Sequence, residues 1–447
     1  MKERDLQKRF APLQEPVTAD EAISEAGRCL FCFDAPCTQA CPAHVDVPGF
    51  IRRILTENFR GAARRLYESN TFAGGCARVC PTLELCEGAC VLKNRDKRPV
   101  SIARLQRFAT DWAIRNRACV LFPGQSTGRH VAIVGAGPAG YSCAAQLACL
   151  GHKVTIFEAR PRAGGLYTYA IAPYKLTTRF TRQELRLLKH LGIRLRPNTK
   201  AGRDVSFDDL LRKYDAVFLG IGRGATAPLK IPGENLKGVM EGLAFLEKTR
   251  TMPLEKIHVG RRVAVIGGGN TAVDSALAAL RLGAREATVV YRRTEEEMPA
   301  YKKEMERARL EGIRFVWLSA PLGILGKRKV EGIRCLRMRL GAPDESGRPR
   351  PVPVKGSEFV LECDMVIKAL GQMLFEDPAM QIRGLKLKKG LIAVDRQTGA
   401  TSVPGLFAGG DCAWGGGGEM VNAISEGIRA ARGIDEMLRR EGQASRF

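Results

Sequence analysis

Long apolar runs, aromatic residues and histidines are all scarce in this sequence of 447 residues. No stretch approaches the roughly 18–20 consecutive apolar residues that a membrane-spanning helix needs. The N-terminal segment MKERDLQKRFAPLQEP is charged where a signal peptide would be apolar. We therefore expect a soluble cytoplasmic protein, in which thiols stay reduced. The 5 histidines form neither a metal-binding pattern nor a triad pattern, so we assign no catalytic residue.

Acidic residues are also few, with 47 Asp and Glu against 71 Lys and Arg, which gives a net charge of +24. Such an excess could indicate a nucleic-acid-binding protein. However, aromatic residues make up only 6%, the basic residues are scattered, and no nucleic-acid motif occurs. The remaining interpretations are a solvated basic surface and a basic face for an acidic protein partner, with some arginines used for phosphates.

Cysteine, in contrast, is concentrated in one region, since eight of the 14 cysteines lie in two short blocks. The first block, CLFCFDAPCTQACP, has the spacing C-x2-C-x4-C-x3-C-P, and the second is CARVCPTLELCEGAC. Short cysteine runs that end in Cys-Pro are typical of [4Fe–4S] ligation, because several irons must be reached from one bent loop. Structural zinc usually shows two C-x2-C pairs, so zinc and unligated cysteines are the alternatives. We expect two clusters with four ligands each.

The segment between the two blocks, VPGFIRRILTENFRGAARRLYESN, has apolar residues at helical spacing. We therefore expect a small helical domain that is held together by its clusters. The residues predicted to form its core face are Phe50, Ile51, Ile54, Leu55, Phe59 and Leu66.

A glycine-rich turn follows the apolar stretch VAIV, and a second strand, KVTIF, ends next to Glu158. In G-x-G-x-x-G the glycines permit a tight turn and close approach to a pyrophosphate at a helix N-terminus, and the acidic residue can bind a ribose. The pattern predicts a dinucleotide site, to which we assign Gly135, Gly137, Pro138, Ala139, Gly140, Glu158, Gly165 and Leu166.

The same pattern recurs in RRVAVIGGGNTAVDSALAALRLGAREATVVYRR, where Ala272 takes the third glycine position. Here the second strand ends in two arginines instead of a glutamate. An arginine can pair with the 2′-phosphate of NADPH, whereas a carboxylate would repel it. The pattern therefore favours NADPH over NADH, unless both arginines are ordinary surface residues. The assigned residues are Gly267, Gly269, Asn270, Thr271, Arg292 and Arg293.

Two dinucleotide sites in one chain suggest one for FAD and one for NAD(P)H. In GLFAGGDCAWGGGGEMVNAISEGIRAARGI, Gly410 and Asp411 precede a glycine run and an amphipathic helix, like the C-terminal flavin motif of flavoproteins with two dinucleotide domains. The separation of this motif from the first glycine turn implies an FAD domain interrupted by the NAD(P)H domain. We predict an α/β protein with a helical double [4Fe–4S] domain and two Rossmann-like domains: residues 1–125 for the clusters, 126–237 and 364–447 for FAD, and 238–363 for NAD(P)H.

Both cysteine blocks, the following SIARLQRFATD and both glycine turns closely resemble the N-terminal half of dihydropyrimidine dehydrogenase, and especially the bacterial small subunit that consists of that half. Glutamate synthase small subunits and the large subunit of NADH-dependent ferredoxin–NADP reductase share this plan. The resemblance implies two ligand sets and leaves Cys76 spare, although spacing alone would make Cys76 the eighth ligand. The first set is Cys29, Cys32, Cys37 and Cys90, and the second is Cys41, Cys80, Cys86 and Gln106.

The resemblance also implies a function, in which NAD(P)H reduces FAD and the clusters pass single electrons to a partner subunit of a hetero-oligomer. The FMN barrel that reduces pyrimidines in the family is missing here, so we expect an FMN-containing pyrimidine-reducing partner. A glutamate synthase large subunit or a ferredoxin is the alternative acceptor. An alternative of another class is a non-catalytic, zinc-bound scaffold whose nucleotide sites only sense redox state.

Overall fold

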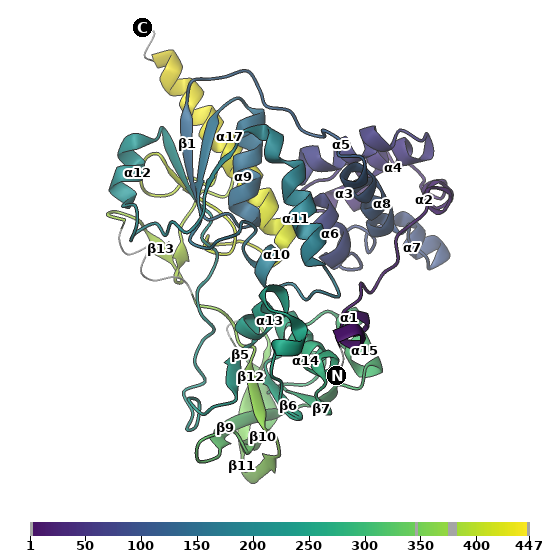
Figure 1. Cartoon of the computed structure of the whole chain (residues 1–447), viewed down its shortest axis with the longest axis vertical. Helices are drawn as coiled ribbons and strands as arrows, with labels where there is room; N and C mark the ends of the chain where they lie inside the picture. The colour runs from purple at the N-terminus through teal and green to yellow at the C-terminus, as the bar shows by residue number, and fades with distance from the viewer. Residues whose placement is uncertain (1–2, 345–346, 374–381, 445–447) are drawn as a thin grey trace. The chain divides into compact units, whose positions relative to one another are not determined.

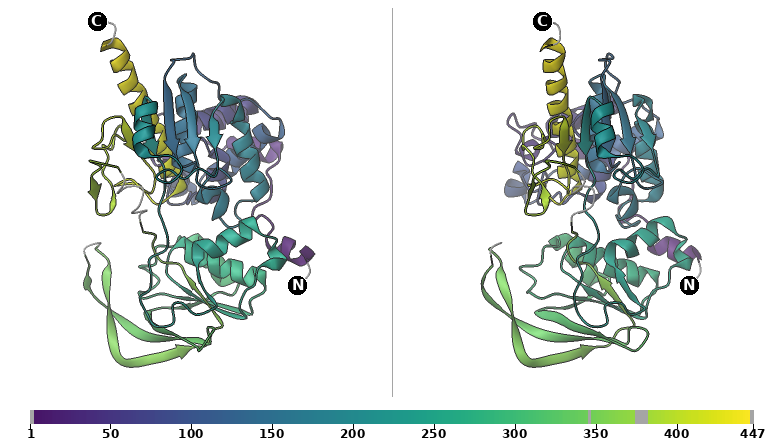
Figure 2. Two further views of the ribbon diagram at one scale, coloured as in Figure 1. Left: turned by 60° about the vertical axis from the view of Figure 1, so that its left-hand side comes forward. Right: turned by 90° about the vertical axis from the view of Figure 1, so that its left-hand side faces the viewer.

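The computed structural model describes residues 3–344, 347–373 and 382–444, and it divides into two compact units (Figures 1 and 2). The first unit comprises Met1–Leu13, Tyr169–Tyr174 and Gly224–Met373. The second comprises Gln14–Thr168, Lys175–Arg223 and Leu374–Phe447. Among the described helices, none has the length and apolar character that a membrane span requires.

The second unit begins with a group of short helices, as the apolar spacing between the cysteine blocks predicts. Phe50, Ile51, Ile54 and Leu66 are fully buried. Leu55 and Phe59 are only partly buried. The Phe59 ring packs edge-on against Phe108 with ring centroids 4.9 Å apart. These helices are α2 (Ala19–Ala26), α3 (Pro36–Gln39), α4 (Val47–Leu55), α5 (Phe59–Ser69), α6 (Ala73–Val79), α7 (Val91–Asp96) and α8 (Ile102–Arg115).

The same unit contains a parallel five-stranded sheet of order β15-β4-β1-β2-β3. Its central strands are almost continuously apolar, as expected for parallel strands that are covered on both faces. Strand β15 pairs with β4 although about 190 residues separate them in the chain, so the predicted split of this domain is present. The strands are β1 (His130–Val134), β2 (Lys153–Phe157), β3 (Arg194–Arg196), β4 (Ala216–Leu219) and β15 (Leu406–Ala408).

Helices α9 and α17 pack closely against each other beside this sheet (Figure 1). Gly427 on α17 permits this, because a Cβ there would overlap the carbonyl oxygen of Ala139 on α9. The remaining elements of the unit are α9 (Pro138–Cys149), α10 (Leu166–Tyr169), α11 (Thr178–Leu187), η1 (Lys189–Leu191), α12 (Phe207–Lys213), β13 (Leu387–Lys388), β14 (Leu391–Ile392) and α17 (Met420–Ala444).

The first unit has its own parallel sheet, of order β5-β12-β6-β7-β8, and a separate antiparallel sheet of order β11-β10-β9. The parallel strands are β5 (Val239–Glu241), β6 (Arg262–Ile266), β7 (Glu286–Val290), β8 (Arg314–Val316) and β12 (Met365–Lys368), and the antiparallel ones are β9 (Ser319–Leu325), β10 (Gly332–Pro343) and β11 (Pro349–Leu361). The helices are α1 (Glu3–Arg9), α13 (Gly242–Thr251), η2 (Leu254–Lys256), α14 (Asn270–Leu282) and α15 (Lys302–Leu310).

The unit that contains the second parallel sheet is larger than the predicted NAD(P)H domain, because it includes Met1–Leu13 and Tyr169–Tyr174 and extends over Gly224–Met373. We expected residues 1–125 to form one domain, but Leu6 and Phe10 are buried in the core of the first unit, where Phe10 lies beside Tyr174. We also expected the NAD(P)H domain to end at residue 363. Strand β12 begins at Met365 and pairs with β5 and β6, so the chain leaves this sheet only after that strand.

Candidate cofactor sites

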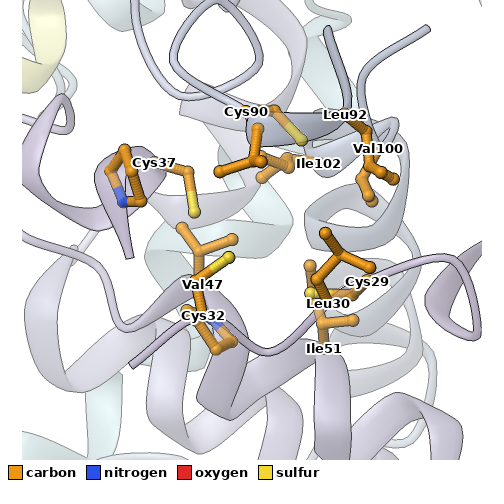
Figure 3. A pocket seen from close by; sticks show the side chains of 13 residues that line it. Cys29, Leu30, Cys32, Cys37, Val47, Ile51, Cys90, Leu92, Val100 and Ile102 are labelled. Atoms are coloured by element: carbon orange, nitrogen blue, oxygen red, sulfur yellow. The ribbon is translucent and has the colours of Figure 1, made fainter. Parts of the chain in front are cut away.

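Four cysteines, which we call the first cysteine group, line one pocket in the helical region: Cys29, Cys32, Cys37 and Cys90 (Figure 3). The loop that carries three of them bends through positive φ at Phe31 (50°) and Ala35 (24°). The fourth comes from the N-cap of α7. Apolar side chains such as Val47 and Ile51 form the rest of the wall. The structure therefore brings together the first ligand set that the resemblance implies.

Ionisation of the thiols in the first cysteine group is unfavourable in the absence of a bound cation. Burial, with the neighbouring thiols Cys29 and Cys90, raises the pKa of Cys37 to about 12. Thiolates crowded into an apolar pocket repel one another, so they ionise only when positive metal charge compensates them. The chemistry of this donor set thus fits a polycationic group.

A second cysteine group lies around α6 and consists of Cys41, Cys76, Cys80 and Cys86. A hydrogen bond between the free thiols of Cys76 and Cys80 raises the pKa of Cys80 well above its usual value, with further contributions from burial, Cys41 and Cys86. Burial is the main cause of the raised pKa of Cys41, and Cys76 adds to it. Cys76 therefore lies close to the three cysteines of the second ligand set.

Gln106, the remaining member of that set, is buried on α8. Its amide nitrogen donates a 2.6 Å hydrogen bond to the carbonyl oxygen of Ala73, at the start of α6. Because the nitrogen is engaged, the side-chain oxygen is the atom left to ligate a metal. Both Gln106 and Cys76 therefore lie at the contact of α6 with α8.

The arrangement of the thiols bears on the choice between zinc and iron–sulfur. A single zinc ion would draw four thiolates to within about 3.8 Å of one another, because each Zn–S bond is about 2.3 Å long. A four-iron cluster gives each iron its own thiolate, so it suits four thiols that line one pocket.

The first glycine turn lies between β1 and α9. Gly135 has φ = 95°, which a residue with a side chain rarely adopts. A Cβ at Gly137 would meet only the Gly220 carbonyl oxygen at 3.9 Å, so this side of the turn is open for a phosphate group. Glu158 is buried and accepts hydrogen bonds of 2.8 Å from the amides of Ala136 and Arg160. Burial raises the pKa of Glu158.

Two distant segments that carry predicted FAD residues lie against this turn. A Cβ at Gly165, which precedes Leu166 at the start of α10, would lie 3.0 Å from the Gly137 Cα. A Cβ at Gly410 would lie 2.9 Å from the Ala139 Cβ. The predicted FAD residues therefore converge from three parts of the chain, and the open cradle beside Gly137 fits a pyrophosphate.

Two residues at this site were not predicted. The Arg223 guanidinium donates a 3.0 Å hydrogen bond to the backbone oxygen of Asp411. Glu426, two turns into α17, accepts a 2.6 Å hydrogen bond from the Gly410 amide. Burial raises the pKa of both carboxyl groups, Asp411 and Glu426. The only sequence signal for Glu426 is an acidic residue on the apolar side of an amphipathic helix.

The second glycine turn lies between β6 and α14. Gly267 has φ = 141° and sits so close to Ala369 that a Cβ would overlap the Ala369 carbonyl oxygen. A Cβ at Gly269 would meet nothing within 4 Å, so this turn is also open to a ligand. Asn270 and Thr271 begin α14, and the Asn270 side chain accepts a 3.1 Å hydrogen bond from the Tyr301 amide.

The two arginines after β7 are in different environments. Arg293 is 2% exposed; it forms an ion pair of 2.6 Å with Asp344 and donates a 2.8 Å hydrogen bond to the Pro349 carbonyl. Arg292 is exposed and has no ion pair among the described residues. We expected both to face the 2′-phosphate, but the pairing of Arg293 leaves Arg292 as the candidate.

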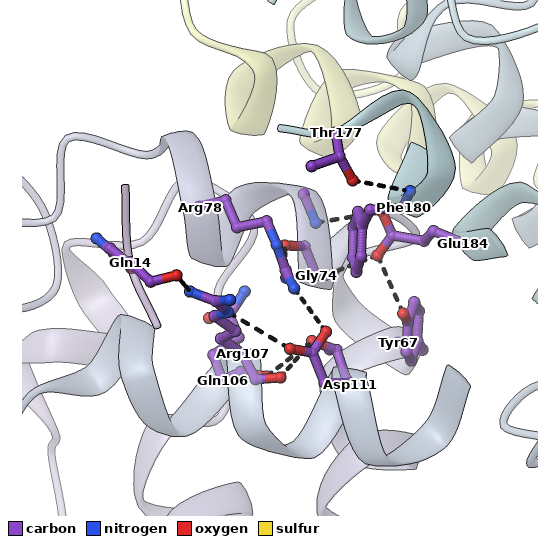
Figure 4. A network of polar contacts seen from close by, with 12 residues as sticks. Gln14, Tyr67, Gly74, Arg78, Gln106, Arg107, Asp111, Thr177, Phe180 and Glu184 are labelled. Atoms are coloured by element: carbon purple, nitrogen blue, oxygen red, sulfur yellow. Dashed lines mark hydrogen bonds and ion pairs between the residues drawn. The ribbon is translucent and has the colours of Figure 1, made fainter. Parts of the chain in front are cut away.

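A buried carboxylate on α11 binds the start of α6, the helix that carries Cys76 (Figure 4). Glu184 on α11 is 0% exposed and accepts hydrogen bonds from the amides of Gly74 and Gly75, at 2.7 and 3.2 Å. The hydroxyls of Tyr67, at 3.0 Å, and Tyr167 also donate to it. Sequence reasoning missed this residue, because its partners lie more than one hundred residues away or on a different element.

Around Glu184, further contacts fix α6 against α8 and α11. The Arg78 guanidinium lies 3.7 Å from the centre of the Phe180 ring and forms an ion pair of 2.6 Å with Asp111 (Figure 4). A Cβ at Gly75 would lie 2.9 Å from the Met420 side chain, at the start of α17. The helix that carries Cys76 therefore touches residues next to the predicted flavin motif.

Comparisons with known proteins agree with this architecture. Residues 6–118 match the family model described as dihydropyrimidine dehydrogenase domain II, 4Fe-4S cluster. Residues 129–427 match that of the pyridine nucleotide-disulphide oxidoreductases. Among solved structures, FprA from Mycobacterium tuberculosis in complex with NADPH has a TM-score of 0.60 and 22% identity over 71% of this chain and 86% of its own. Thioredoxin reductase from T. acidophilum has a TM-score of 0.54 and 22% identity over 69% of this chain and 99% of its own. These two structures share the fold.

Curated relatives are subunits of several different enzymes. The chain is 37% identical to the glutamate synthase [NADPH] small chain of Escherichia coli, over 96% of this chain and 94% of that one. It is 40% identical to the beta subunit of the NADP(+)-dependent formate dehydrogenase of Moorella thermoacetica, over 91% of this chain, but it spans only 60% of that subunit. It is 37% identical to the NADPH-Fe(3+) oxidoreductase subunit beta of Geobacter sulfurreducens, over 92% of this chain and 65% of that subunit.

These matches confirm the predicted oxidoreductase class, the α/β fold and the expected cofactors, FAD, a nicotinamide nucleotide and [4Fe–4S] clusters. They support the expected resemblance at the level of a wider group rather than the dihydropyrimidine dehydrogenase half specifically. The chain belongs to the pyridine nucleotide-disulphide oxidoreductase family, as a member that carries an N-terminal domain of the dihydropyrimidine dehydrogenase 4Fe-4S type.

Proposed function

We propose that this chain is the electron-input subunit of a larger enzyme, which oxidises NADPH and delivers single electrons to a partner subunit. When bound, FAD links the two-electron chemistry of a nicotinamide to the one-electron chemistry of iron–sulfur clusters. The relatives named as small or beta subunits support a partner, since each is part of a multisubunit enzyme by its name.

The observation that carries the proposal is the contact between α6, the helix that carries Cys76, and the predicted FAD region inside one compact unit. Helix α6, which holds Cys76 and ends at Cys80, is fixed to Glu184 on α11 and lies against Tyr167. Tyr167 follows the Gly165–Leu166 segment at the first glycine turn. Electron transfer slows steeply with distance, so this close packing is what a flavin-to-cluster path requires.

The residues that would hold each cofactor follow from the same geometry. The turn at Gly135 to Gly140 and the segment around Gly410 would hold FAD, with Glu158 as an acceptor for its ribose. The turn at Gly267 to Gly269 would hold the nicotinamide nucleotide, with Arg292 facing a 2′-phosphate. The first cysteine group would ligate one cluster, and Cys41, Cys80 and Cys86 with Gln106 the other.

The test is the metal content of protein purified without oxygen, together with its response to NADPH. We expect about eight irons and eight acid-labile sulfides per FAD, the sum for two four-iron clusters. We also expect NADPH to reduce FAD and clusters, seen by absorbance and electron paramagnetic resonance. Near-zero iron with bound zinc would overturn the proposal in favour of a non-catalytic scaffold.

For the electron acceptor, we propose an FMN-containing, pyrimidine-reducing subunit. The buried Gln106 in the RLQRF segment and the six-residue step from Cys80 to Cys86 favour it. A glutamate synthase large chain is the second candidate, because the chain covers 94% of a glutamate synthase small chain. Reconstitution with each partner distinguishes them: NADPH oxidation would depend on uracil or thymine in one case, and on glutamine with 2-oxoglutarate in the other.

A further inference from the structure

The rim of the pocket that holds the first cysteine group carries exposed apolar side chains. Leu30 and Val91 line this pocket and are 49% and 42% exposed. Phe33 directly follows Cys32 and is 106% exposed. A single exposed apolar residue is normal, whereas several gathered around one site mark an interaction surface. We call Leu30, Phe33 and Val91 the apolar rim.

The two phenylalanines of this loop, Phe31 and Phe33, differ in solvent exposure. Phe31 is partly buried, and the Arg52 guanidinium lies 5.0 Å from the centre of its ring. Phe33 has no aromatic or cationic partner among the described residues and projects fully into solvent. An aromatic side chain that the fold leaves uncovered, one position from a cluster cysteine, is available to an external surface.

A strongly basic segment adjoins the apolar rim. Helix α7 starts at Val91, immediately after Cys90. The exposed basic residues that follow, which we call the basic segment, are Lys93, Arg95, Lys97 and Arg98. Nearby acidic residues are fewer: Asp34 is exposed, Asp96 lies within the segment, and Glu25 is paired with Arg28 and Arg98. The surroundings of the pocket therefore carry net positive charge.

We propose that the apolar rim and the basic segment form the docking surface for an acidic electron-accepting protein, which is reduced from the cluster of the first cysteine group. This proposal rests on the proposed function and adds the exit point of the electrons and the charge of the partner. An apolar centre with a charged border is the usual anatomy of a protein interface, and opposite charges accelerate encounter.

The electron balance is simple. Oxidation of one NADPH to NADP⁺ and H⁺ releases two electrons, so two molecules of a one-electron acceptor are reduced for each NADPH. Every electron that leaves through the docking surface is replaced from the nicotinamide site. The acceptor therefore needs a redox centre of its own near an acidic face, and no proton has to cross the interface.

The experiment compares two haem proteins of opposite charge as probes, acidic cytochrome b5 and basic cytochrome c, with the uncharged quinone menadione as a small-molecule acceptor. The holoenzyme is assayed with NADPH at several ionic strengths. We expect Phe33→Ala to lower kcat/KM for cytochrome b5 about tenfold, the loss typical of an aromatic interface residue. The double variant Lys93→Glu with Lys97→Glu should lower kcat/KM for cytochrome b5 further. In this variant, kcat/KM should no longer decrease as the ionic strength rises. Menadione reduction should stay unchanged in both variants.

Matched controls come from the other compact unit. Leu310 is 89% exposed on α15, so Leu310→Ala removes a comparable apolar side chain. Lys327→Glu with Arg328→Glu reverses two exposed charges in the turn between β9 and β10. Both control variants should reduce cytochrome b5 at the wild-type rate.

Several outcomes would overturn the proposal. One is a wild-type enzyme whose clusters are reduced by NADPH but which reduces cytochrome b5 no faster than cytochrome c. Another is wild-type cytochrome b5 reduction in Phe33→Ala and in the charge-reversed variant. A change of molecular mass in Phe33→Ala with unchanged electron transfer would assign the surface to self-association. If NADPH does not reduce the clusters, the proposed function is wrong. The proposed docking surface would then be wrong as well, because it rests on that function.

Discussion

The carboxylate of Glu184 accepts a 2.7 Å hydrogen bond from the backbone amide of Gly74, at the first turn of the helix that carries Cys76. Helix N-termini leave such amides without partners, and a carboxylate satisfies them with favourable charge. Here the carboxylate comes from α11, which lies between β2 and β3 in the chain and packs against α6 and α8, and not from the N-terminal helices themselves. The helix that carries Cys76 is therefore held in place by a part of the same unit that we predict to belong to the FAD domain.

Replacement of this carboxylate tests its role. Each carboxylate oxygen of Glu184 accepts two hydrogen bonds, so the side chain accepts four in total. In a glutamine, the amide nitrogen that replaces one oxygen cannot accept any. We expect Glu184→Gln to lower the free energy of unfolding by about 1.5–3 kcal/mol, the range for hydrogen bonds to a charged group. Anaerobic urea unfolding, followed by flavin fluorescence, measures the change. Glu68→Gln on α5, where the side chain is 36% exposed, is the control and should be near neutral.

Positioning of the cluster helix has a spectroscopic consequence. If Glu184 orients α6, Glu184→Gln should also alter the electron paramagnetic resonance signal of one reduced cluster and slow its reduction by NADPH, while NADPH-dependent menadione reduction is retained. Lower stability with an unaltered cluster signal would show that the contact is structural only.

The identity of the eighth cluster ligand can be decided with two variants. We expect Gln106→Ala to lose or damage one cluster while FAD stays bound, because its side-chain oxygen is the atom free to ligate. Cys76→Ser should retain both clusters. Iron content and the resonance signals of each variant provide the measurement. The reverse pattern, with iron lost from Cys76→Ser only, would make Cys76 the ligand.

The two arginines after β7 should behave differently when each is replaced. Arg292→Ala should raise the KM for NADPH about tenfold or more, since it removes a charge-assisted bond to a phosphate, and leave the KM for NADH unchanged. Arg293→Ala should instead destabilise the unit by about 1–3 kcal/mol, because it removes the buried guanidinium that binds Asp344 and the Pro349 carbonyl oxygen. Arg285→Ala, an exposed arginine on the same unit, serves as the control. Equal effects of Arg292→Ala on NADPH and NADH would contradict the assignment.

Cys412, next to Asp411, should be chemically silent in the native protein. Its thiol is fully buried, and burial raises its pKa to about 12. A raised pKa keeps the thiol protonated, so only about one molecule in a thousand would hold a thiolate at pH 9. We expect no alkylation of Cys412 by iodoacetamide and no thiolate–flavin charge-transfer absorption between pH 7 and 9. Protein unfolded in guanidinium, where Cys412 should react readily, is the control. A charge-transfer band with a midpoint near pH 8 would contradict the expectation.

The sequence predicts the parts of this molecule whose chemistry is local. The turn at Gly135 needs a residue that tolerates positive φ, and the cysteine loop needs closely spaced thiols, so both leave readable patterns. Alternating strands and helices similarly indicate two parallel sheets.

Long-range contacts leave no such pattern, and they account for what the sequence did not predict. Arg293 looked available for a phosphate because its partner, Asp344, lies 51 residues further on. Helix α1 precedes the cysteine blocks in the chain, but Leu6 and Phe10 are buried in the hydrophobic core of the first unit. In the sequence, Glu184 is one acidic residue in an arginine-rich helix. Its role becomes visible only in the structure, where Gly74 and Tyr67 donate hydrogen bonds to it.

The pairing of β15 with β4 also constrains how the protein is made. The sheet beside the first glycine turn lacks an edge strand, and the turn lacks Gly410 and Asp411, until the ribosome has synthesised residues 406–411. At about 5–20 residues per second, the N-terminal helices emerge tens of seconds earlier, and the last strand of the interrupting nicotinamide unit emerges a few seconds earlier. Completion of the predicted flavin site is therefore a late event in biogenesis. The N-terminal helices must acquire iron, or be protected from oxygen, before that site is complete.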